Sequence, residues 1–508
     1  MNSKVSQIKR LLSFFGPGFL IAVGYVDPGN WATDLSAGSQ FGYRMIFVIL
    51  LSNIMAVHIQ YLSLKLGVVT NLDLAQACKR FFPFWINIIL YILCEIAIMA
   101  MDLAEIIGTA IALNLLFKLP IPYGILLTGL DVFVVMAFWK RKTRYIFELF
   151  IILLMSAVSL CFLILVFYSK PVFIDILKGF IPSSVLVMNE GLFLSLGIIG
   201  ATVMPHNLYL HSHLVKFRAP YNNTSSSYYS PLEEKKNDEK EILDEVYDSN
   251  RVDTWLQTFS ENENSVSKKI FKLREAIKFT TVDSTFCLSI AFFINSFILI
   301  VSSANFYARG LNDVADIKDA YNLLNSYLGL FAATLFAIAL LASGQSSTIT
   351  GTLAGTIVME GFLGSTFKLP CWLRRIVTRF LAIVPAMCVS IFMGETGINQ
   401  LLVLSQVILS MQLPFAIWPL IYFTSSKLIM NKKEFTNNNS TTLNENTVDN
   451  STVENLTEIE VNHNPNNVEE NNFVVHDFTN NLYLVISTCL FGLLMTGLNM
   501  YLVISQFI

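Results

Sequence analysis

The sequence predicts an all-α protein that crosses a membrane many times. Of its 508 residues, 54% are hydrophobic and only 14% are charged, and the mean hydropathy is +0.56. A chain of this length with many apolar runs of about 20 residues is too apolar to form one water-soluble core. A third observation is that two of these runs are interrupted by a proline beside polar side chains, at Asp27-Pro28-Gly29-Asn30 and at Met204-Pro205-His206-Asn207.

Hydropathy along the chain predicts eleven membrane spans, each long enough for a bilayer core of about 30 Å. The expected ranges are 13–37, 45–67, 84–116, 121–139, 146–168, 191–215, 277–304, 327–358, 376–393, 398–424 and 480–505. Two long polar segments lie between some of these spans.

Lysine and arginine residues crowd into every second connection between these spans. Examples are Lys79 and Arg80 after the second span, residues 140–144 after the fourth, and Arg374 and Arg375 before the ninth. Because basic loops remain on the cytoplasmic side, we expect a cytoplasmic N-terminus and, with an odd number of spans, a C-terminus outside. The membrane is expected to be the plasma membrane or that of an acidic endosomal or vacuolar compartment.

The two polar segments, residues 219–269 and 431–472, are rich in charged residues or in Asn, Thr and Glu. Such segments bury too little apolar surface to offset their ordering entropy, so we expect two disordered cytoplasmic loops. They are either tolerated insertions without function or regulatory and partner-binding segments. Their cytoplasmic position predicts that the sequons at Asn222, Asn439, Asn450 and Asn455 are not glycosylated.

The two interrupted spans predict the functional site. A proline break inside a membrane is tolerated where the freed backbone groups face protein or a water-filled cavity, and an ionisable residue there costs about 2.5–3.5 kcal/mol. When the two prolines are aligned, Asn30 corresponds to Asn207 and Asp27 corresponds to Met204. Paired interruptions of this kind indicate a transporter's ion site, which we expect to lie between the two breaks.

The side chains at the breaks indicate a transition metal. Asp27 supplies an anionic oxygen, Asn30 a carbonyl oxygen and Met204 a thioether. Oxygen ligands suit Mg²⁺ and Ca²⁺, whereas sulfur favours softer dications. The backbone carbonyls of Gly24 and Ala201, left without donors by the breaks, are further candidate ligands. The alternative for Met204 is a core methionine that fills a gap.

Titratable residues inside the spans indicate a path for protons. His206 and His211 lie in the sixth span, where imidazole could also ligate a metal, while His213 is expected to be an ordinary interfacial residue. Asp102 and Glu105 in the third span share a helix face. Their basic partner is expected to be Arg379, with Arg375 about one turn away; the alternative is a static buried ion pair.

Neutral polar residues are weaker candidates. Gln406 and Asn295 are of a type that mostly holds helices together, at roughly 0.6 kcal/mol each. Gln406 is a further candidate ligand that position alone does not establish. The seven cysteines are scattered and form no zinc or CxxC spacing, so they are interpreted as core residues.

Five stretches of the sequence carry a resemblance to a known family. They read GYVDPGNWATDLSAGSQFGY, MDLAEIIGTAIALNLLF, GATVMPHNLYLHS, LFAIALLASGQSSTITGTLAGTIVMEGFL and LSQVILSMQLPFAIWPL. With these motifs the chain resembles the Nramp family of proton-coupled divalent metal transporters, the natural resistance-associated macrophage proteins and the bacterial manganese transporters.

The resemblance implies a LeuT-like fold of the APC superfamily, built from five plus five spans in inverted repeats, with spans 1 and 6 unwound at midplane. The first repeat is then expected in residues 1–168 and the second in residues 191–425, with 219–269 as an insertion, and the eleventh span is 480–505. Gly24 stands where many relatives have alanine, which leaves ligation by its carbonyl unchanged and implies a looser hinge.

The resemblance also implies roles for individual residues. Metal ligation falls to Asp27, Asn30, Met204, Gly24 and Ala201, with Gln406 joining in inward-closed states, while Asn295 lies near the ion or its access path. A proton route is implied through Asp27, His206, His211, Asp102 and Glu105 towards the arginines of the ninth span, of which Arg379 is the best match.

These observations predict a proton-coupled symporter, not an enzyme, that imports Mn²⁺ or Fe²⁺ by alternating access. The metal is cargo and H⁺ the coupling ion; no cofactor and no nucleic acid partner is expected, and the chain is expected to function as a monomer in the lipid bilayer. The alternatives are a metal-permeable channel or metal-sensing receptor on the same scaffold, or a sodium-coupled amino-acid carrier. A metalloenzyme is disfavoured because no HExxH motif is present.

Overall fold

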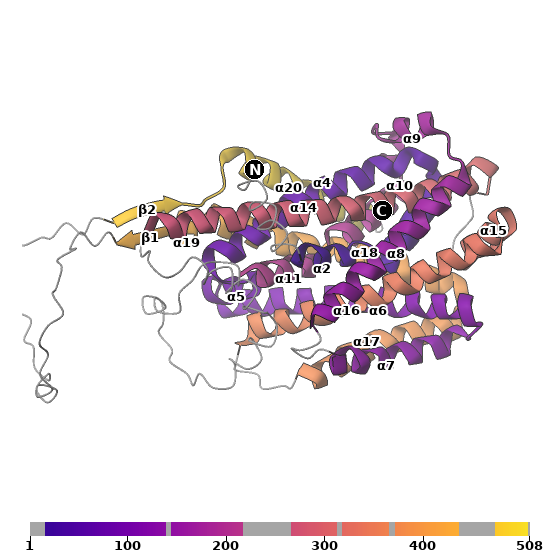
Figure 1. The fold of residues 1–508 in the computed structure, drawn as a ribbon, viewed down its shortest axis with the longest axis horizontal. Helices are drawn as coiled ribbons and strands as arrows, with labels where there is room; N and C mark the ends of the chain where they lie inside the picture. The colour runs from indigo at the N-terminus through magenta and orange to yellow at the C-terminus, as the bar shows by residue number, and fades with distance from the viewer. Residues whose placement is uncertain are drawn as a thin grey trace, which may run out of the picture.

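A computed structural model of the chain describes residues 16–138, 144–216, 266–311, 317–364, 371–435 and 473–505. These parts are built mainly from long helices that run side by side along the long axis of the molecule (Figure 1). The long helices, with the two broken pairs given first, are α2 (Pro17–Gly24) and α3 (Pro28–Phe41), α10 (Asn189–Val203) and α11 (Pro205–Lys216), then α4 (Ile46–Thr70), α6 (Phe84–Phe117), α7 (Ile121–Phe138), α8 (Arg144–Ser169), α14 (Val266–Asn305), α16 (Leu330–Leu363), α17 (Cys371–Phe392), α18 (Gly394–Ser425) and α20 (Leu482–Ser505).

Short elements connect the long helices. They are α5 (Leu74–Phe81), α9 (Phe173–Gly179), α15 (Ile317–Leu328), α19 (Lys427–Met430), and the 3₁₀ turns η1 (Gly42–Met45), η2 (Ser184–Val187) and η4 (Tyr307–Arg309). Figure 1 places α9 and α15 at one end of the molecule and α5 and α19 at the other.

Each predicted span coincides with one helix or one broken pair of helices. Within the described residues, seven helical stretches are long and apolar enough to cross a membrane, and two shorter apolar helices lie at Met155–Ser169 and Ile376–Phe392. The predicted number of eleven spans remains a prediction. The largest difference is in α14, which begins at Val266 whereas the predicted span begins at 277, so the helix continues well beyond its apolar part.

Both predictions of disordered loops need correction at their edges. Residues 266–269 belong to α14, and residues 431–435 form strand β1 (Asn431–Phe435), which pairs antiparallel with β2 (Phe473–Asp477). Polar composition did not predict this strand because its backbone groups are satisfied by a partner far away in the sequence. The rest of both segments, with the four sequons, lies outside the described residues.

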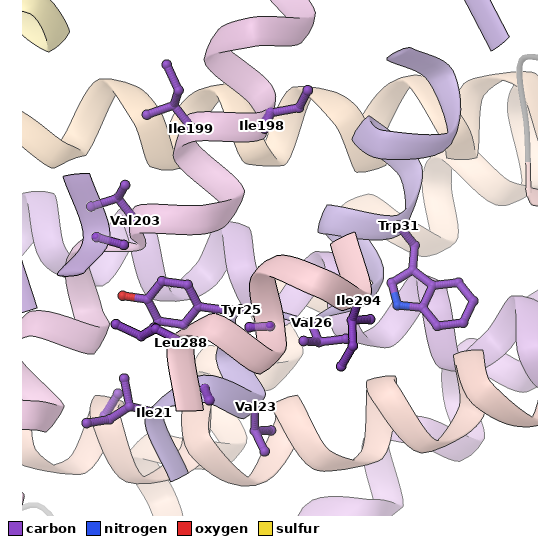
Figure 2. Close-up of a cluster of buried hydrophobic side chains, with 14 of the residues drawn as sticks. Ile21, Val23, Tyr25, Val26, Trp31, Ile198, Ile199, Val203, Leu288 and Ile294 are labelled. Carbon is purple, nitrogen blue, oxygen red and sulfur yellow. The ribbon is translucent and has the colours of Figure 1, made fainter. Parts of the chain in front are cut away.

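The core is centred on the broken helices. Figure 2 shows the apolar side chains around the breaks, with Ile21, Val23 and Tyr25 near Leu288 of α14 and with Ile198, Ile199 and Val203 on α10. On α3, the buried ring of Trp31 lies at centroid distances of 4.6 Å from Phe162 and 5.3 Å from Phe336. Helices α8, α14 and α16 thus enclose the first broken pair.

Candidate metal site

The two helix breaks arise from the same local cause. In a helix the carbonyl of residue i accepts a bond from the N–H of residue i+4, and proline has no N–H. Pro28 therefore leaves the Gly24 carbonyl without its donor, and Pro205 does the same for Ala201. Each break thus frees a backbone oxygen in the core of the bundle.

Asp27 and Asn30 organise the first break. Asp27 is the N-cap of α3, and its Oδ1 accepts from the backbone N–H of Asn30 at 2.9 Å and from the Asn30 side-chain amide at 2.6 Å. The same amide donates to the freed carbonyl of Ala201 at 3.0 Å. Asn30 therefore joins the first break directly to the second.

Several buried oxygen atoms at this junction lack a donor. Asp27 and Gln406 are both 0% exposed, and Asp27 Oδ2 and Gln406 Oε1 have no hydrogen-bond partner within the described residues. The side-chain amide of Gln406 lies against Gly29, where even one added carbon would collide with it. A buried anion beside orphaned acceptor oxygens is costly unless a cation completes it, so the residues present fit a metal ion.

Met204 occupies the second break and is fully buried. Its sulfur lies 3.6 Å from the side-chain nitrogen of Asn207. A Cβ on Gly24 would lie 2.6 Å from the same nitrogen, so Gly24 allows the close approach of the two breaks. Met204 also contacts a small apolar cluster that is separate from the main core and contains Ala97, Ala100, Met101 and Leu409.

Asn295 of α14 was predicted near the ion or its access path, and it lies beside the first break. Its side-chain amide donates to the Tyr25 carbonyl at 3.0 Å and to Asn30 Oδ1 at 3.3 Å. Its own Oδ1 has no partner among the described residues. Asn295 therefore holds Asn30 and leaves another acceptor oxygen beside it.

A hydrogen-bond chain on the α2 side of the break was not predicted. The Gln60 side-chain amide donates to the Tyr25 hydroxyl at 2.8 Å, and Gln60 Oε1 lies 2.7 Å from His211 Nδ1. Ser343 of α16 donates to the freed carbonyl of Val26. The last turn of α2 is thus tied to α4, α11 and α16, and the polar Gln60 in an apolar span was the available signal.

The predicted ion pair between the third and ninth spans is present. The Arg379 guanidinium lies 3.2 Å from Asp102 Oδ1 and 3.3 Å from Glu105 Oε2, and it donates to the Thr348 hydroxyl at 3.4 Å. All three charged residues are buried. The side chain of Arg375 lies outside the described part of the structure.

His206 differs from the other two histidines of its helix. It is fully buried and neither ring nitrogen has a hydrogen-bond partner within the described residues. His213, by contrast, was wrongly expected to be an ordinary interfacial residue: its Nδ1 lies 3.0 Å from Asp73 Oδ2, and Lys216 reaches the same oxygen at 3.2 Å. The sequence separation of 140 residues between Asp73 and His213 hid this contact.

Asp73 lies in the turn before α5 and outside the apolar spans. It is the N-cap of that helix and forms a capping box with Gln76. Burial alone would raise the pKa of its carboxyl, but the hydrogen bond with His213 and the charge of Lys216 hold the pKa below its ordinary value. This charged cluster joins α5 to the end of α11.

The candidate metal ligands at the breaks are of several chemical types. No group of three or more His, Cys, Asp and Glu side chains in the described ranges could hold a metal ion. The donors at the breaks are one carboxylate, amide and backbone oxygens and a thioether. Such a mixed, weakly charged set suits an ion that must also be released.

Comparison with known proteins identifies the chain's relatives. The family model for natural resistance-associated macrophage protein-like (Nramp) matches residues 18–444. The divalent metal cation transporter MntH of Nostoc sp. is 48% identical over 431 residues, covering 84% of this chain and 86% of the relative. The MntH protein of Listeria innocua is 49% identical over 432 residues, covering 85% of each chain.

Solved structures agree in fold. The manganese transporter of Eremococcus coleocola matches with a TM-score of 0.72 and 32% identity, covering 99% of this chain and 88% of its own. Mhp1, a nucleobase-cation-symport-1 family transporter, matches with a TM-score of 0.51 and 14% identity, covering 80% and 78%, and shows the fold alone. These likenesses confirm the predicted all-α polytopic fold of the LeuT type. The chain is a member of the Nramp family, a multi-pass membrane transporter of divalent metal cations.

Proposed function

We propose that this transporter is a proton-coupled symporter that imports Mn²⁺ or Fe²⁺ by alternating access. The observation that carries the proposal is the orphaned Asp27 Oδ2, a buried anionic oxygen beside Gln406 Oε1, between two helix breaks of which one bears a thioether. The naming of one structural relative as a manganese transporter supports the choice of metal.

The ligands are proposed to be Asp27, Asn30 and Met204 together with the Gly24 and Ala201 carbonyls. Gln406 joins them when the inner side is closed, which its contact with Gly29 supports. In this structure the Asn30 side-chain amide donates a hydrogen bond to the Ala201 carbonyl oxygen. A metal that takes this oxygen must displace that amide, so binding changes the bond joining the two breaks.

The proton is proposed to leave Asp27 when a dication arrives, because a positive ion disfavours the protonated acid. His206 is the next carrier, since neither of its ring nitrogens has a hydrogen-bond partner among the described residues. The proton continues through Asp102 and Glu105 to Arg379 and Arg375. His211 is a second proton carrier beside this route, and its contact with Gln60 fixes the position of its ring. The acids of the third span are in this view a route rather than a static pair.

Alternating access is proposed to move the helices of the first and sixth spans against the rest. Gln60 of α4 contacts both Tyr25 at the end of α2 and His211 of α11, so these contacts have to break when α2 and α11 move away from α4. The two repeats are proposed to be residues 1–168 and 191–425. Each contributes one broken span, which accounts for the mirrored positions of Asp27 and Met204.

The orientation is proposed from the distribution of basic residues. The N-terminus then lies in the cytoplasm and the C-terminus outside, in a plasma membrane or an acidic compartment membrane. This orientation puts the connections that contain Asp73, Lys216 and the β1–β2 pair on the cytoplasmic side. We propose that one chain suffices for transport.

Uptake into proteoliposomes with an imposed pH gradient tests the function. We expect Mn²⁺ and Fe²⁺ uptake that rises when the outside is acidic, accompanied by proton entry reported by a trapped pH dye. Flux without proton movement would instead indicate a channel, and binding without flux a receptor. Amino-acid uptake driven by Na⁺ would favour the carrier alternative, which the Met204 thioether fits poorly.

A further inference from the structure

Asp34 is a buried acid that the proposed mechanism does not use. It lies on α3 with an exposed fraction of 0%, and neither of its carboxylate oxygens has a hydrogen-bond partner within the described residues. A carboxylate taken out of water without donors or a counter-charge is strongly destabilising. A buried carboxylate at Asp34 therefore has to bind a proton or a cation.

The position of Asp34 relates it to the metal site. It follows Asn30 by four residues, a spacing that places two residues on one helix face, and it follows Asp27, the N-cap of the helix, by seven. The rise of about 1.5 Å per residue puts Asp34 roughly 10 Å along the helix axis from Asp27. Asp27, Asn30 and Asp34 therefore form one line of oxygen-bearing side chains that begins at the break.

The helices around α3 fix this line in the interior. On α14, Asn295 donates to Asn30 at 3.3 Å and Ser302 donates to the Leu35 carbonyl at 2.6 Å, so the two helices are joined on both sides of Asp34. On α10, Gly197 leaves room for Thr33, whose methyl group would lie 3.0 Å from an added Cβ. Asn295 Oδ1, which has no donor among the described residues, is a neutral acceptor next to the hydrogen bond between Asn295 and Asn30.

We propose that Asp34 is a second cation-binding carboxylate, a station that holds the divalent ion on the side of Asp27 away from α2. This inference rests on the proposed transport function, and it extends the ion path by one site. The Asp34 station offers oxygen donors, whereas the thioether of Met204 lies at the second helix break. Oxygen donors do not favour transition metals over Ca²⁺, so the station binds Mn²⁺ and Ca²⁺ alike and leaves discrimination to Met204.

Electron paramagnetic resonance of Mn²⁺ tests the station directly, since free and protein-bound Mn²⁺ give different signals. The full-length protein is titrated with Mn²⁺ after Asp27→Ala has removed the main site. We expect residual weak binding that Ca²⁺ displaces. Adding Asp34→Asn should reduce this binding at least tenfold, whereas adding Asp175→Asn should not. Asp175 is the matched control because it is an exposed acid paired with Lys178 at 2.9 Å.

The same substitution in the otherwise native chain gives a kinetic readout. Asp34→Asn should raise the KM for Mn²⁺ uptake about tenfold with little change in kcat, because the ion reaches the Asp27 site less often. Absence of residual binding in Asp27→Ala, or equal binding with and without Asp34→Asn, would overturn the inference. If Asp34→Asn lowers the melting temperature more than Asp175→Asn, the titration is repeated with Asp34→Ser and decides on the same criteria.

Failure of the proposed function gives a different result. In that case the unmodified protein would show no proton-linked metal uptake, whatever the EPR titration of the Asp27→Ala protein shows. Failure of the Asp34 inference alone would leave proton-linked uptake intact in the unmodified protein, with the same KM for Mn²⁺ in Asp34→Asn.

Discussion

The Asn30 side chain lies between Asp27 and Ala201, donating to Asp27 Oδ1 at 2.6 Å and to the Ala201 carbonyl at 3.0 Å. One amide thus contacts candidate ligands from both broken helices. A metal ion that draws on these ligands competes with that amide. Binding of the ion and the relative position of the two breaks are therefore linked.

Asp27→Ala should abolish metal uptake. The substitution removes the Asp27 carboxylate from the junction of the breaks and with it the N-cap of α3, whose loss costs about 1 kcal/mol. Uptake of Mn²⁺ into proteoliposomes measures the loss. Asp27→Asn keeps a capping oxygen and serves as control for the cap; uptake by Asp27→Asn at the native rate would contradict an anionic ligand.

Met204→Ala should relax the selectivity of transport. A thioether favours transition metals over Ca²⁺ and Mg²⁺, so its removal should let these ions compete with Mn²⁺ at roughly tenfold lower concentrations. Competition in liposome uptake is the measurement. Met101→Ala in the same apolar cluster controls for the cavity that truncation leaves, and unchanged competition in Met204→Ala would refute the thioether argument.

Tyr25→Phe should loosen α2. It removes the hydroxyl that accepts from Gln60 at 2.8 Å and leaves a buried amide N–H without that partner, at a cost of about 1–3 kcal/mol. Peptides covering residues 17–24 should then exchange amide hydrogen for deuterium faster by about tenfold or more. Tyr61→Phe, next to Gln60 on α4, is the control, and equal exchange in both variants would show that the bond does not hold α2.

Asp73→Asn should destabilise the protein at neutral pH by about 3 kcal/mol, since it leaves Lys216 and His213 buried without their anion. Because the pKa of Asp73 is lower in the folded than in the unfolded protein, its contribution is fully present above the unfolded value near 4 and is lost as the pH falls through the folded value. Thermal unfolding from pH 7 to pH 3 checks this. The difference between the native chain and Asp73→Asn should narrow below about pH 4, and a constant difference would exclude the charge as its cause.

Gly29→Ala should impair uptake while leaving the helices intact. An added Cβ would collide with the Gln406 amide and would lie 2.9 Å from Asp27 Oδ2. Circular dichroism should be unchanged while the KM for Mn²⁺ rises at least tenfold. Gly497→Ala on α20, where a Cβ meets nothing within 4 Å, is the control.

The sequence predicted those parts of the site that depend on local chemistry. The breaks could be predicted because Pro28 and Pro205 remove a backbone donor wherever they stand in a helix. The Asp102–Arg379 pair could be predicted because a buried charge requires a partner. His213 could not be placed, since its burial depends on Asp73 from another part of the chain, and Asp34 was missed because its lack of partners is a property of the packed structure.

The fold was likewise predictable in its long apolar helices and less so in its polar connections. Hydropathy carries the signal for a span, whereas the start of α14 at Val266 and strand β1 depend on contacts that composition does not encode. Tyr25 and Gln60 are an intermediate case. Both stand in predicted spans, but only the packing of α2 against α4 and α11 brings the Tyr25 hydroxyl, Gln60 and His211 together.

The pairing of Phe435 with Phe473 brings together the two ends of residues 436–472. Just beyond β2, the Asn480 amide donates to the Thr424 hydroxyl at 2.8 Å, and Lys65 donates to the Thr479 carbonyl at 3.1 Å, so the base of this hairpin is fastened to α18 and α4. Because Phe435 and Phe473 are held side by side, the sequence between them can change in length or composition during evolution without shifting the helices that carry the ion. A regulatory segment can therefore be added between these two residues while the helices of the transporter keep their relative positions.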